Sequence, residues 1–280
     1  MSTTKEIEKR GSRSGGRAAR RALRSSPLAE NLRPVRPGME GGHYRPLSAS
    51  DEQKIYSAAL DALETIGLSQ APKSGINHMV RAGALLGDDG RLRYPRSLVE
   101  DMLDKAKKNI TLYGREEKFD MELKGSRVYF GTAGAAVHIV DIENKEYRDS
   151  TSVDLYQAAQ IAHELDNVHF FQRAMVCRDI EDNYEMDLNT LYACCGGTTK
   201  HVGTSFSEPA HVKGCFELLH LLAEGEEKWR KRPFVSNSNC FVVPPMKFAT
   251  ESCETMELCI QNGMPILLLS AGQAGATSSA

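Results

Sequence analysis

Several features of membrane and secreted proteins are missing from this sequence. No apolar run approaches the ~20 residues of a membrane-spanning helix. The first residues, MSTTKEIEKRGSRSGG, include no apolar stretch of the signal-peptide type. The seven cysteines are an odd number at irregular positions, which argues against a disulfide framework and predicts reduced thiols. These absences predict a cytoplasmic protein with no membrane partner.

The motifs of several common chemistries are also absent. No predicted strand ends in a Gly-x-Gly-x-x-Gly turn, and no Gly-x-Ser-x-Gly elbow occurs. The turn Gly131-Thr-Ala-Gly134 lacks the lysine of a phosphate-binding loop, and no His or Cys spacing forms a zinc site. We therefore predict neither a nucleotide site nor a metal site.

Charge is balanced overall but unevenly distributed. Lys and Arg total 35 and Asp and Glu total 37, so net charge gives no reason to expect a nucleic-acid partner. Residues 1–46 carry eleven basic and four acidic side chains and are rich in Gly, Ser and Pro. Such a segment buries too little apolar surface to fold alone. It is predicted to be a flexible or wrapping arm against the acidic remainder; an RNA-binding tail and a targeting peptide are the alternatives.

Residues 47–150 are predicted to form a helical region followed by β-hairpins. Apolar residues recur at helical spacing after Ser50, and further helices are expected over 75–86 and from Pro95. The period then changes to that of strands. The β-rich segments are 110–113, 127–130 and 136–142, with a turn at 141–145.

From residue 151 to 280 the pattern becomes a regular alternation of helices and strands. Thr151 and Ser152 are residue types that cap a helix, and the first helix is expected to follow them. The expected strands are 168–177, 201–207, 234–243 and 265–270. Four strand–helix repeats of ~30 residues predict a parallel sheet with crossover helices. The sheet is either open and doubly wound or closed into a (β/α)8 TIM barrel. The missing Gly-x-Gly-x-x-Gly turn favours the barrel.

Only the first four β/α units of a barrel fit into this stretch. The segment 265–270 reads PILLLS, and its apolar centre predicts a strand covered on both faces. A bare apolar edge strand promotes aggregation. We therefore expect the chain to be an N-terminal half-barrel whose other half lies in a longer protein or in another chain.

Seven short segments together resemble the trimethylamine methyltransferase family, in order and in spacing. They are Asn31-Leu-Arg-Pro-Val-Arg-Pro-Gly38, Tyr129-Phe-Gly-Thr-Ala-Gly134, Asp141, Thr151-x-x-Asp154, Thr199-Lys-His-Val202, Asn237-Ser-Asn-Cys-Phe-Val-Val-Pro-Pro245 and Ser270-Ala-Gly-Gln-Ala-Gly-Ala-Thr277. None of them would suffice alone.

The resemblance implies a (β/α)8 barrel and methyl transfer from a methylated amine to the cobalt of a corrinoid, which a separate small protein carries. It implies no cofactor bound directly by this chain. Archetypal family members contain pyrrolysine in the C-terminal half, and many relatives without it act on quaternary amines such as glycine betaine. The sequence does not decide between the two types or give the oligomeric state, and a homo-oligomer is one option.

Candidate substrate-binding residues follow from the predicted strand ends. They are Asp179, Glu208, Asn239, Phe241 and Gln273. The two acids would supply negative potential to a cationic substrate, and the two amides would orient a substrate carboxylate or contact a corrinoid edge. Phe241 would contribute an aromatic face to the cation. Each has a structural alternative: a surface or helix-capping acid, a hydrogen bond at the barrel rim, or a core aromatic.

The catalytic residues are not identified by the sequence. A second hypothesis is that the 280-residue chain is an inert or partner-completed half-barrel with no activity alone, because half a barrel does not surround a substrate.

Overall fold

The computed structural model describes Arg21 and residues 33–270. The chain divides into two compact units, Met1–Arg36 and Pro37–Ala280. Most of the predicted basic arm lies outside the described residues, and the sheet and the candidate site belong to the second unit. No helix among the described residues is long and apolar enough to cross a membrane.

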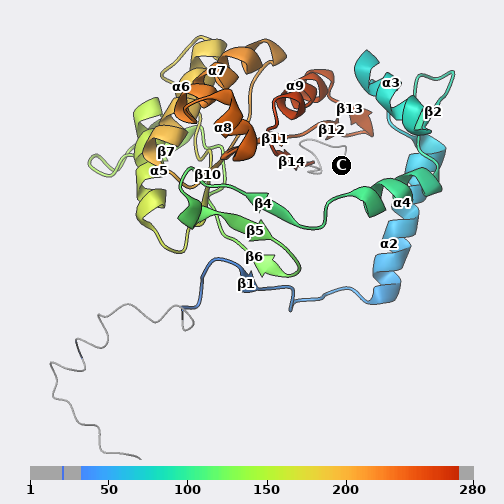
Figure 1. Ribbon diagram of the computed structural model, residues 1–280, viewed down its shortest axis with the longest axis horizontal. Helices are drawn as coiled ribbons and strands as arrows, with labels where there is room; N and C mark the ends of the chain where they lie inside the picture. Colours follow the sequence, from blue (N-terminus) through green and yellow to red (C-terminus); the bar gives the residue numbers. More distant parts are fainter. Residues whose placement is uncertain (1–20, 22–32, 271–280) are drawn as a thin grey trace, which may run out of the picture. The chain divides into compact units, whose positions relative to one another are not determined.

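A four-stranded parallel sheet forms the centre of the second unit (Figure 1). Its strands are β9 (Phe170–Gln172), β10 (His201–Thr204), β11 (Val235–Asn239) and β14 (Ile266–Leu268). They lie side by side in their order along the chain, without the reversal of order that marks a doubly wound sheet. The predicted α/β class with a parallel sheet is confirmed.

A further segment, residues 130–136, runs parallel to β9 along its free edge. Gly131 forms a parallel β-bridge with Phe170, and Ala136 forms one with Met175. The Phe130 carbonyl accepts a hydrogen bond from the His169 amide at 2.7 Å. A Cβ on Gly131 would lie 2.4 Å from the Phe170 ring, so only glycine allows this approach. The sequence placed these residues in a separate hairpin region, whereas the structure joins them to the sheet.

Helices connect successive parallel segments, as expected for β/α units. They are α5 (Ser152–Glu164), α6 (Asn183–Gly197), the 3-10 turn η4 (Pro209–His211) with α7 (Val212–Leu222), α8 (Glu226–Lys231) and α9 (Thr250–Gln261). Helix α5 packs on α6, and α6 packs on α7 (Figure 1). Their apolar faces and the sheet bury Phe171, Leu191, Val202, Leu219 and Trp229 in one core. Burial of each such side chain contributes about 1.5–3 kcal/mol.

Helix α5 is held at both ends by side chains. At its start, Thr151 and Asp154 form the reciprocal capping box that satisfies two backbone amides. At its end, the buried Lys200, only 3% exposed, donates to the carbonyls of Ala162, Leu165 and Val168 at 2.6–2.8 Å. A cation at a helix C-terminus offsets the negative end of the helix dipole. Lys200 of the Thr-Lys-His-Val segment is therefore a structural residue.

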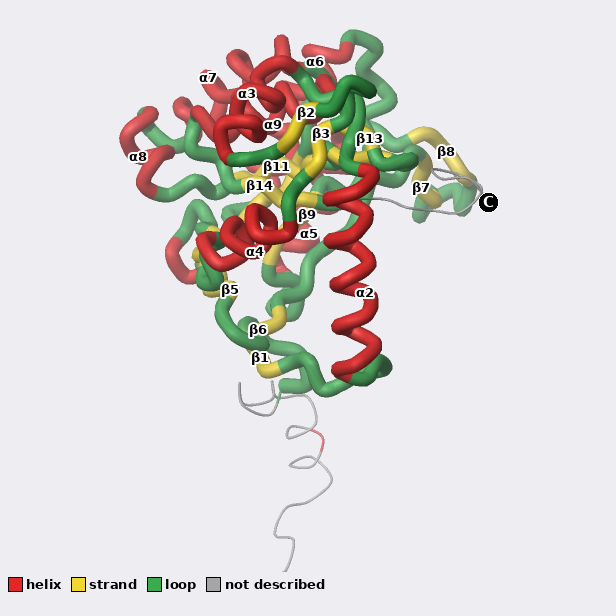
Figure 2. The backbone as a smooth tube through the Cα atoms, turned by 90° about the vertical axis from the view of Figure 1, so that its right-hand side faces the viewer, coloured by secondary structure: helices red, strands yellow, loops and turns green. Residues whose placement is uncertain are grey.

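The residues before the sheet form short helices and hairpins (Figure 2). The helices are α2 (Ala49–Asp61), its π-helical extension η2 (Ala62–Ile66), α3 (Lys73–Ala82), α4 (Arg96–Lys105) and the 3-10 turn η3 (Glu117–Phe119). The antiparallel pairs are β1 (Met39–Glu40) with β6 (Arg127–Val128), β2 (Leu85–Leu86) with β3 (Leu92–Arg93), β4 (Ile110–Leu112) with β5 (Met121–Leu123), and β7 (His138–Val140) with β8 (Tyr147–Asp149). The expected turn at 141–145 connects the last pair, which projects outward in Figure 2.

Several predicted elements end earlier in the structure than the apolar pattern indicated. The helix expected over 75–86 stops at Ala82, because Gly83 adopts a left-handed conformation and residues 85–86 pair with β3. The strand expected over 234–243 divides into β11 and a separate hairpin of β12 (Val242–Val243) with β13 (Lys247–Phe248). Helix α9 begins at Thr250, after this hairpin.

The described residues do not supply the two-sided cover that the apolar run 265–270 predicts. Strand β14 has one neighbour, β11, among the described strands. Leu267 and Leu268 point to opposite faces and are 50% and 58% exposed. An apolar sequence alone therefore does not show that a strand is buried, and no described strand pairs with the free edge of β14.

Candidate functional site

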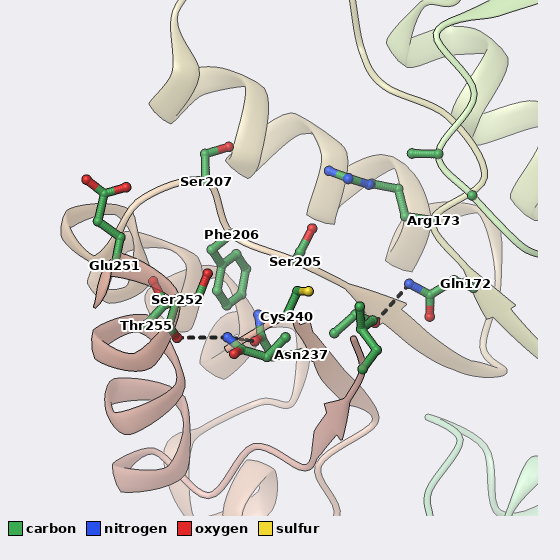
Figure 3. Close-up of a pocket in the computed structure, with 15 residues that line it drawn as sticks. Gln172, Arg173, Ser205, Phe206, Ser207, Asn237, Cys240, Glu251, Ser252 and Thr255 are labelled. Carbon is green, nitrogen blue, oxygen red and sulfur yellow. Dashed lines mark hydrogen bonds between the residues drawn. The ribbon is translucent and has the colours of Figure 1, made fainter. Parts of the chain in front are cut away.

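A cavity of about 360 Å³ lies at the carboxyl edge of the parallel sheet (Figure 3). It is lined by segments that follow the sheet strands and by the first turns of α9. The lining residues are Gly134, Ala135, Gln172, Arg173, Ser205, Phe206, Ser207, Asn237, Ser238, Asn239, Cys240, Glu251, Ser252, Thr255 and Leu269. The carboxyl ends of parallel strands meet at one edge, which is where α/β proteins bind ligands. This cavity is therefore the candidate site.

Strand β11 supplies alternating polar side chains to the cavity. Its sequence Val-Ser-Asn-Ser-Asn is unusual for a buried parallel strand, which is normally rich in aliphatic residues. Ser238 accepts a hydrogen bond from Gln172 Nε2 at 3.0 Å, which ties β11 to β9 across β10. Asn239, on the opposite face, donates to the Ser252 carbonyl in α9 at 2.9 Å. The alternation of a strand thus sends serines and asparagines to different walls.

The hydrogen bonds define how the two buried asparagines are oriented. The Ser252 carbonyl only accepts, so the Asn239 group facing it must be the Nδ2 donor. The same Nδ2 lies 3.3 Å from Asn237, which must therefore present Oδ1. Asn237 Nδ2 and Asn239 Oδ1 are left with no partner among the described residues. Two residues of the cavity lining thus carry one unpaired donor and one unpaired acceptor, each unfavourable to leave unpaired when buried.

The cavity also holds two side chains of opposite charge. Arg173 follows β9, and Glu251 stands in the first turn of α9 (Figure 3). Neither forms an ion pair with another described residue. Charges that no neighbour neutralises, beside a partly enclosed cavity, are available to a ligand.

A buried acid holds the loop between β10 and η4 against the cavity. Asp187 of α6 is almost fully buried, and its carboxylate accepts hydrogen bonds from the backbone amide and the hydroxyl of Ser207 at 2.8 and 2.9 Å. The same carboxylate lies 2.8 Å from His211 Nδ1. Asp187 thus sets the path of residues 205–207, which line the cavity.

Of the predicted site residues, the structure places Asn239 in the lining of the cavity. Phe241 packs instead in a second cluster with Phe248. Asp179 is exposed and accepts from the Ser152 amide and hydroxyl at the start of α5. Glu208 is exposed at the start of η4, 3.9 Å from His211. Gln273 lies outside the described residues.

The sequence analysis missed Gln172, Arg173 and Glu251. The apolar-rich stretch 168–177 looked like one long strand, so its polar end was placed at Asp179. In the structure β9 ends at Gln172, and beyond it the Val176 amide binds the Ala136 carbonyl of the segment 130–136. The polar pair Gln172-Arg173 within the apolar run was the available signal. Glu251 was not among the predicted residues; in the structure it lies in the first turn of α9, which begins one residue before it.

No metal or thiol chemistry is indicated in the part of the chain that the structure describes. No group of three or more His, Cys, Asp or Glu side chains is placed to hold a metal ion there. All seven cysteines are free thiols, and burial raises the pKa of Cys194 and Cys195, whose neutral forms pack in the core. Only Cys240 lines the cavity among the seven.

The sequence comparisons agree on one group of enzymes. The model of the family described as trimethylamine methyltransferase (MTTB) matches residues 13–280. The trimethylamine methyltransferase MttB of Desulfitobacterium hafniense is 28% identical over 233 residues, which are 82% of this chain and 47% of that protein. MttB of Methanosarcina barkeri is 23% identical over 238 residues, 83% of this chain and 48% of that protein. The chain spans about half the length of the curated relatives it matches.

Proposed function

The chain belongs to the trimethylamine methyltransferase family, and from this premise we propose that it takes part in methyl transfer from a methylated amine to the cobalt of a corrinoid. Family membership confirms the resemblance inferred from the short motifs. The amine is proposed to be tertiary or quaternary, with trimethylamine and glycine betaine as the two candidates to test.

The observation that carries the proposal is the oxygen-rich wall of the cavity at the carboxyl edge of the sheet. A methylated ammonium spreads its positive charge over its methyl groups and has at most one N–H to donate. It is therefore held by carboxylate and carbonyl oxygens and by aromatic faces. Asn239 Oδ1, which lacks a partner, the Glu251 carboxylate and the Phe206 ring all belong to this lining.

We assign substrate contact to Asn239 and Glu251 and a positioning role to Gln172. The hydrogen bond from Gln172 to Ser238 holds the two strand ends at a set separation. Methyl transfer requires the carbon in line between the nitrogen and the acceptor, so rigid walls contribute directly to the rate. Asp179 and Glu208 lie outside the lining, and as exposed charges they act on a cation only through a screened potential.

The corrinoid is proposed to be carried by a separate protein that approaches the carboxyl edge. The four strands and the segment 130–136 are proposed to be part of a (β/α)8 barrel, because their order in space is their order in the chain. The acceptor cobalt must reach the same edge as the cavity, because the methyl group passes directly from the amine nitrogen to the cobalt.

A specific observation supports the alternative that the chain is inactive until further polypeptide completes it. Described residues cover β14 only in part: Ile266 packs against the core, whereas Leu267 and Leu268 are half exposed or more. A wall at this edge would enclose the cavity from the side of Leu269, which already lines it.

Methyl transfer to free Co(I) cobalamin tests the proposal. The isolated chain is mixed with cob(I)alamin and either trimethylamine or glycine betaine, and methylcobalamin is followed by its absorbance. We expect Asn239→Leu and Glu251→Gln each to lower turnover at least ~10-fold, the effect of losing one contact to a charged group. The matched control Asn189→Leu removes an exposed asparagine of α6 that bonds the Glu185 carbonyl. Equal rates in all variants would refute the assigned contacts, and no turnover by a folded wild-type chain would favour the alternative.

A further inference from the structure

The first turns of helix α9 line the cavity, and its N-terminus has no side-chain cap. The helix has 12 residues, and the residue before it, Ala249, has extended dihedrals (φ −90°, ψ 101°) suited to a capping residue. Alanine has no side-chain acceptor, and no capping hydrogen bond is made. The first amides of a helix have no partner within it, and they carry the positive end of the helix dipole. Two residues of this first turn, Glu251 and Ser252, line the cavity.

A second observation at the same place points independently to a ligand. Asn237 is 1% exposed and lines the cavity, and its Nδ2 donor has no partner among the described residues. The chain of hydrogen bonds from Ser252 through Asn239 to Asn237 determines which atom this is. The unpartnered atom is therefore a donor, and a group that satisfies it must be an acceptor. Figure 3 shows Asn237 beside the start of α9.

The charged side chains of the lining are compatible with a negatively charged ligand. Arg173 adds a guanidinium that has no ion pair with any other described residue. Glu251 is the opposing charge, and its carboxylate is directed away from Asn237 in Figure 3. A helix N-terminus with an adjacent side-chain donor is a common way to bind an oxyanion.

We propose that the N-terminus of α9 and the amide of Asn237 form a binding subsite for the oxyanion of a small ligand, a carboxylate or a phosphate group. For a substrate that itself carries a carboxylate, such as glycine betaine, the subsite deepens the proposed function and rests on it; for trimethylamine, which has no anionic group, it takes a second ligand. The subsite binds by hydrogen bonds and charge alone, with no covalent step, so anion binding and methyl transfer can be measured separately.

Anion binding to the full chain is measured with sodium phosphate and with sodium acetate, each against sodium chloride at equal ionic strength. The readouts are the urea midpoint of unfolding, which a ligand of the folded state raises, and the amide chemical shifts of Glu251 and Ser252. A response to acetate alone indicates a carboxylate ligand and one to phosphate alone a phosphoryl ligand, while responses to both indicate a general oxyanion site. A wild-type chain that responds to neither overturns the proposal.

The decisive variant is Ala249→Asp. Its side chain supplies the missing cap, so it occupies the first-turn amides of α9 and places a negative charge at the subsite. We expect this variant to unfold at a higher urea concentration than wild type and to show no response to either anion. Because the variant is more stable, loss of binding is not loss of folding. Anion responses equal to those of wild type would overturn the proposal.

A second variant tests the side-chain donor. Asn237→Leu removes Nδ2 with little change in volume and is expected to weaken anion binding at least ~10-fold, the usual effect of losing a hydrogen bond to a charged group. The control Asn189→Leu, on the surface of α6, is expected to bind like wild type. If Asn237→Leu does not fold, Ala249→Asp decides alone. Unchanged binding in folded Asn237→Leu contradicts the role of Asn237.

Discussion

Acid should destabilise this fold through one buried histidine. His201, in the first position of β10, is 1% exposed, and burial lowers the pKa of its imidazole from 6.5 to about 4. Its Nδ1 lies 2.8 Å from the Tyr113 carbonyl, which only accepts, so Nδ1 carries the proton. Its Nε2, at 3.0 Å from the Ser236 hydroxyl, is the acceptor. The neutral ring satisfies both partners.

The pKa shift gives the sign and the size of the effect. The unfolded chain binds a proton at His201 below pH 6.5, whereas the folded chain does so only below about pH 4. Stability is therefore fully present above pH 6.5 and is lost as the pH falls from 6.5 to 4. A difference of this size corresponds to about 3 kcal/mol of unfolding free energy.

Urea unfolding at a series of pH values from 8 to 4 measures this loss in wild type and in His201→Gln. Glutamine keeps one donor and one acceptor but does not titrate, so its curve should fall by about 3 kcal/mol less over this range. His169, whose pKa is also lowered by burial, contributes equally to both curves. Replacement of the exposed His43 by glutamine controls for the loss of an imidazole from the surface. Parallel curves for wild type and His201→Gln would refute the reasoning.

Three further predictions concern single residues. Lys200→Met should cost about 3 kcal/mol by urea unfolding, because three carbonyls in the last turn of α5 and the loop after it lose their charged donor; a change below about 0.5 kcal/mol would contradict this role. Asp187→Ala should cost about 3 kcal/mol, and exchange of the Ser207 amide should become faster, since that amide loses its acceptor; unchanged exchange would argue against anchoring. Gly131→Ala should lower the unfolding free energy by about 1–3 kcal/mol, as its Cβ meets the Phe170 ring at 2.4 Å, and an unaffected midpoint would show that the segment 130–136 detaches readily.

Local patterns predicted the class of the fold and much of its element order. Thr151 is of a residue type that caps helices, and it does mark the start of α5. The turn at 141–145 is likewise readable from its own residues. These signals are short in range, because capping and turn formation involve backbone groups within a few residues. They carry over to the folded chain without change.

Which residues line the cavity depends on where each strand ends, and the predicted strand ends differ from the structure where tertiary contacts decide that point. Asn239 was found because β11 ends in its polar residues. Arg173 was missed because β9 ends before it, and beyond that point Val176 bonds Ala136, 40 positions away in the chain. No window of local sequence contains both partners of such a contact.

The sequence by itself determined the alternation of helices and strands, which follows from local periodicity, and the family, which follows from the resemblance of its short motifs. Only the tertiary structure decided that Lys200 caps a helix, that segment 130–136 joins the sheet, and that Asn237 and Asn239 keep one free donor and one free acceptor. The reason is physical: whether a polar atom is satisfied depends on which groups folding brings within hydrogen-bond distance. The order of residues along the chain does not by itself specify that distance.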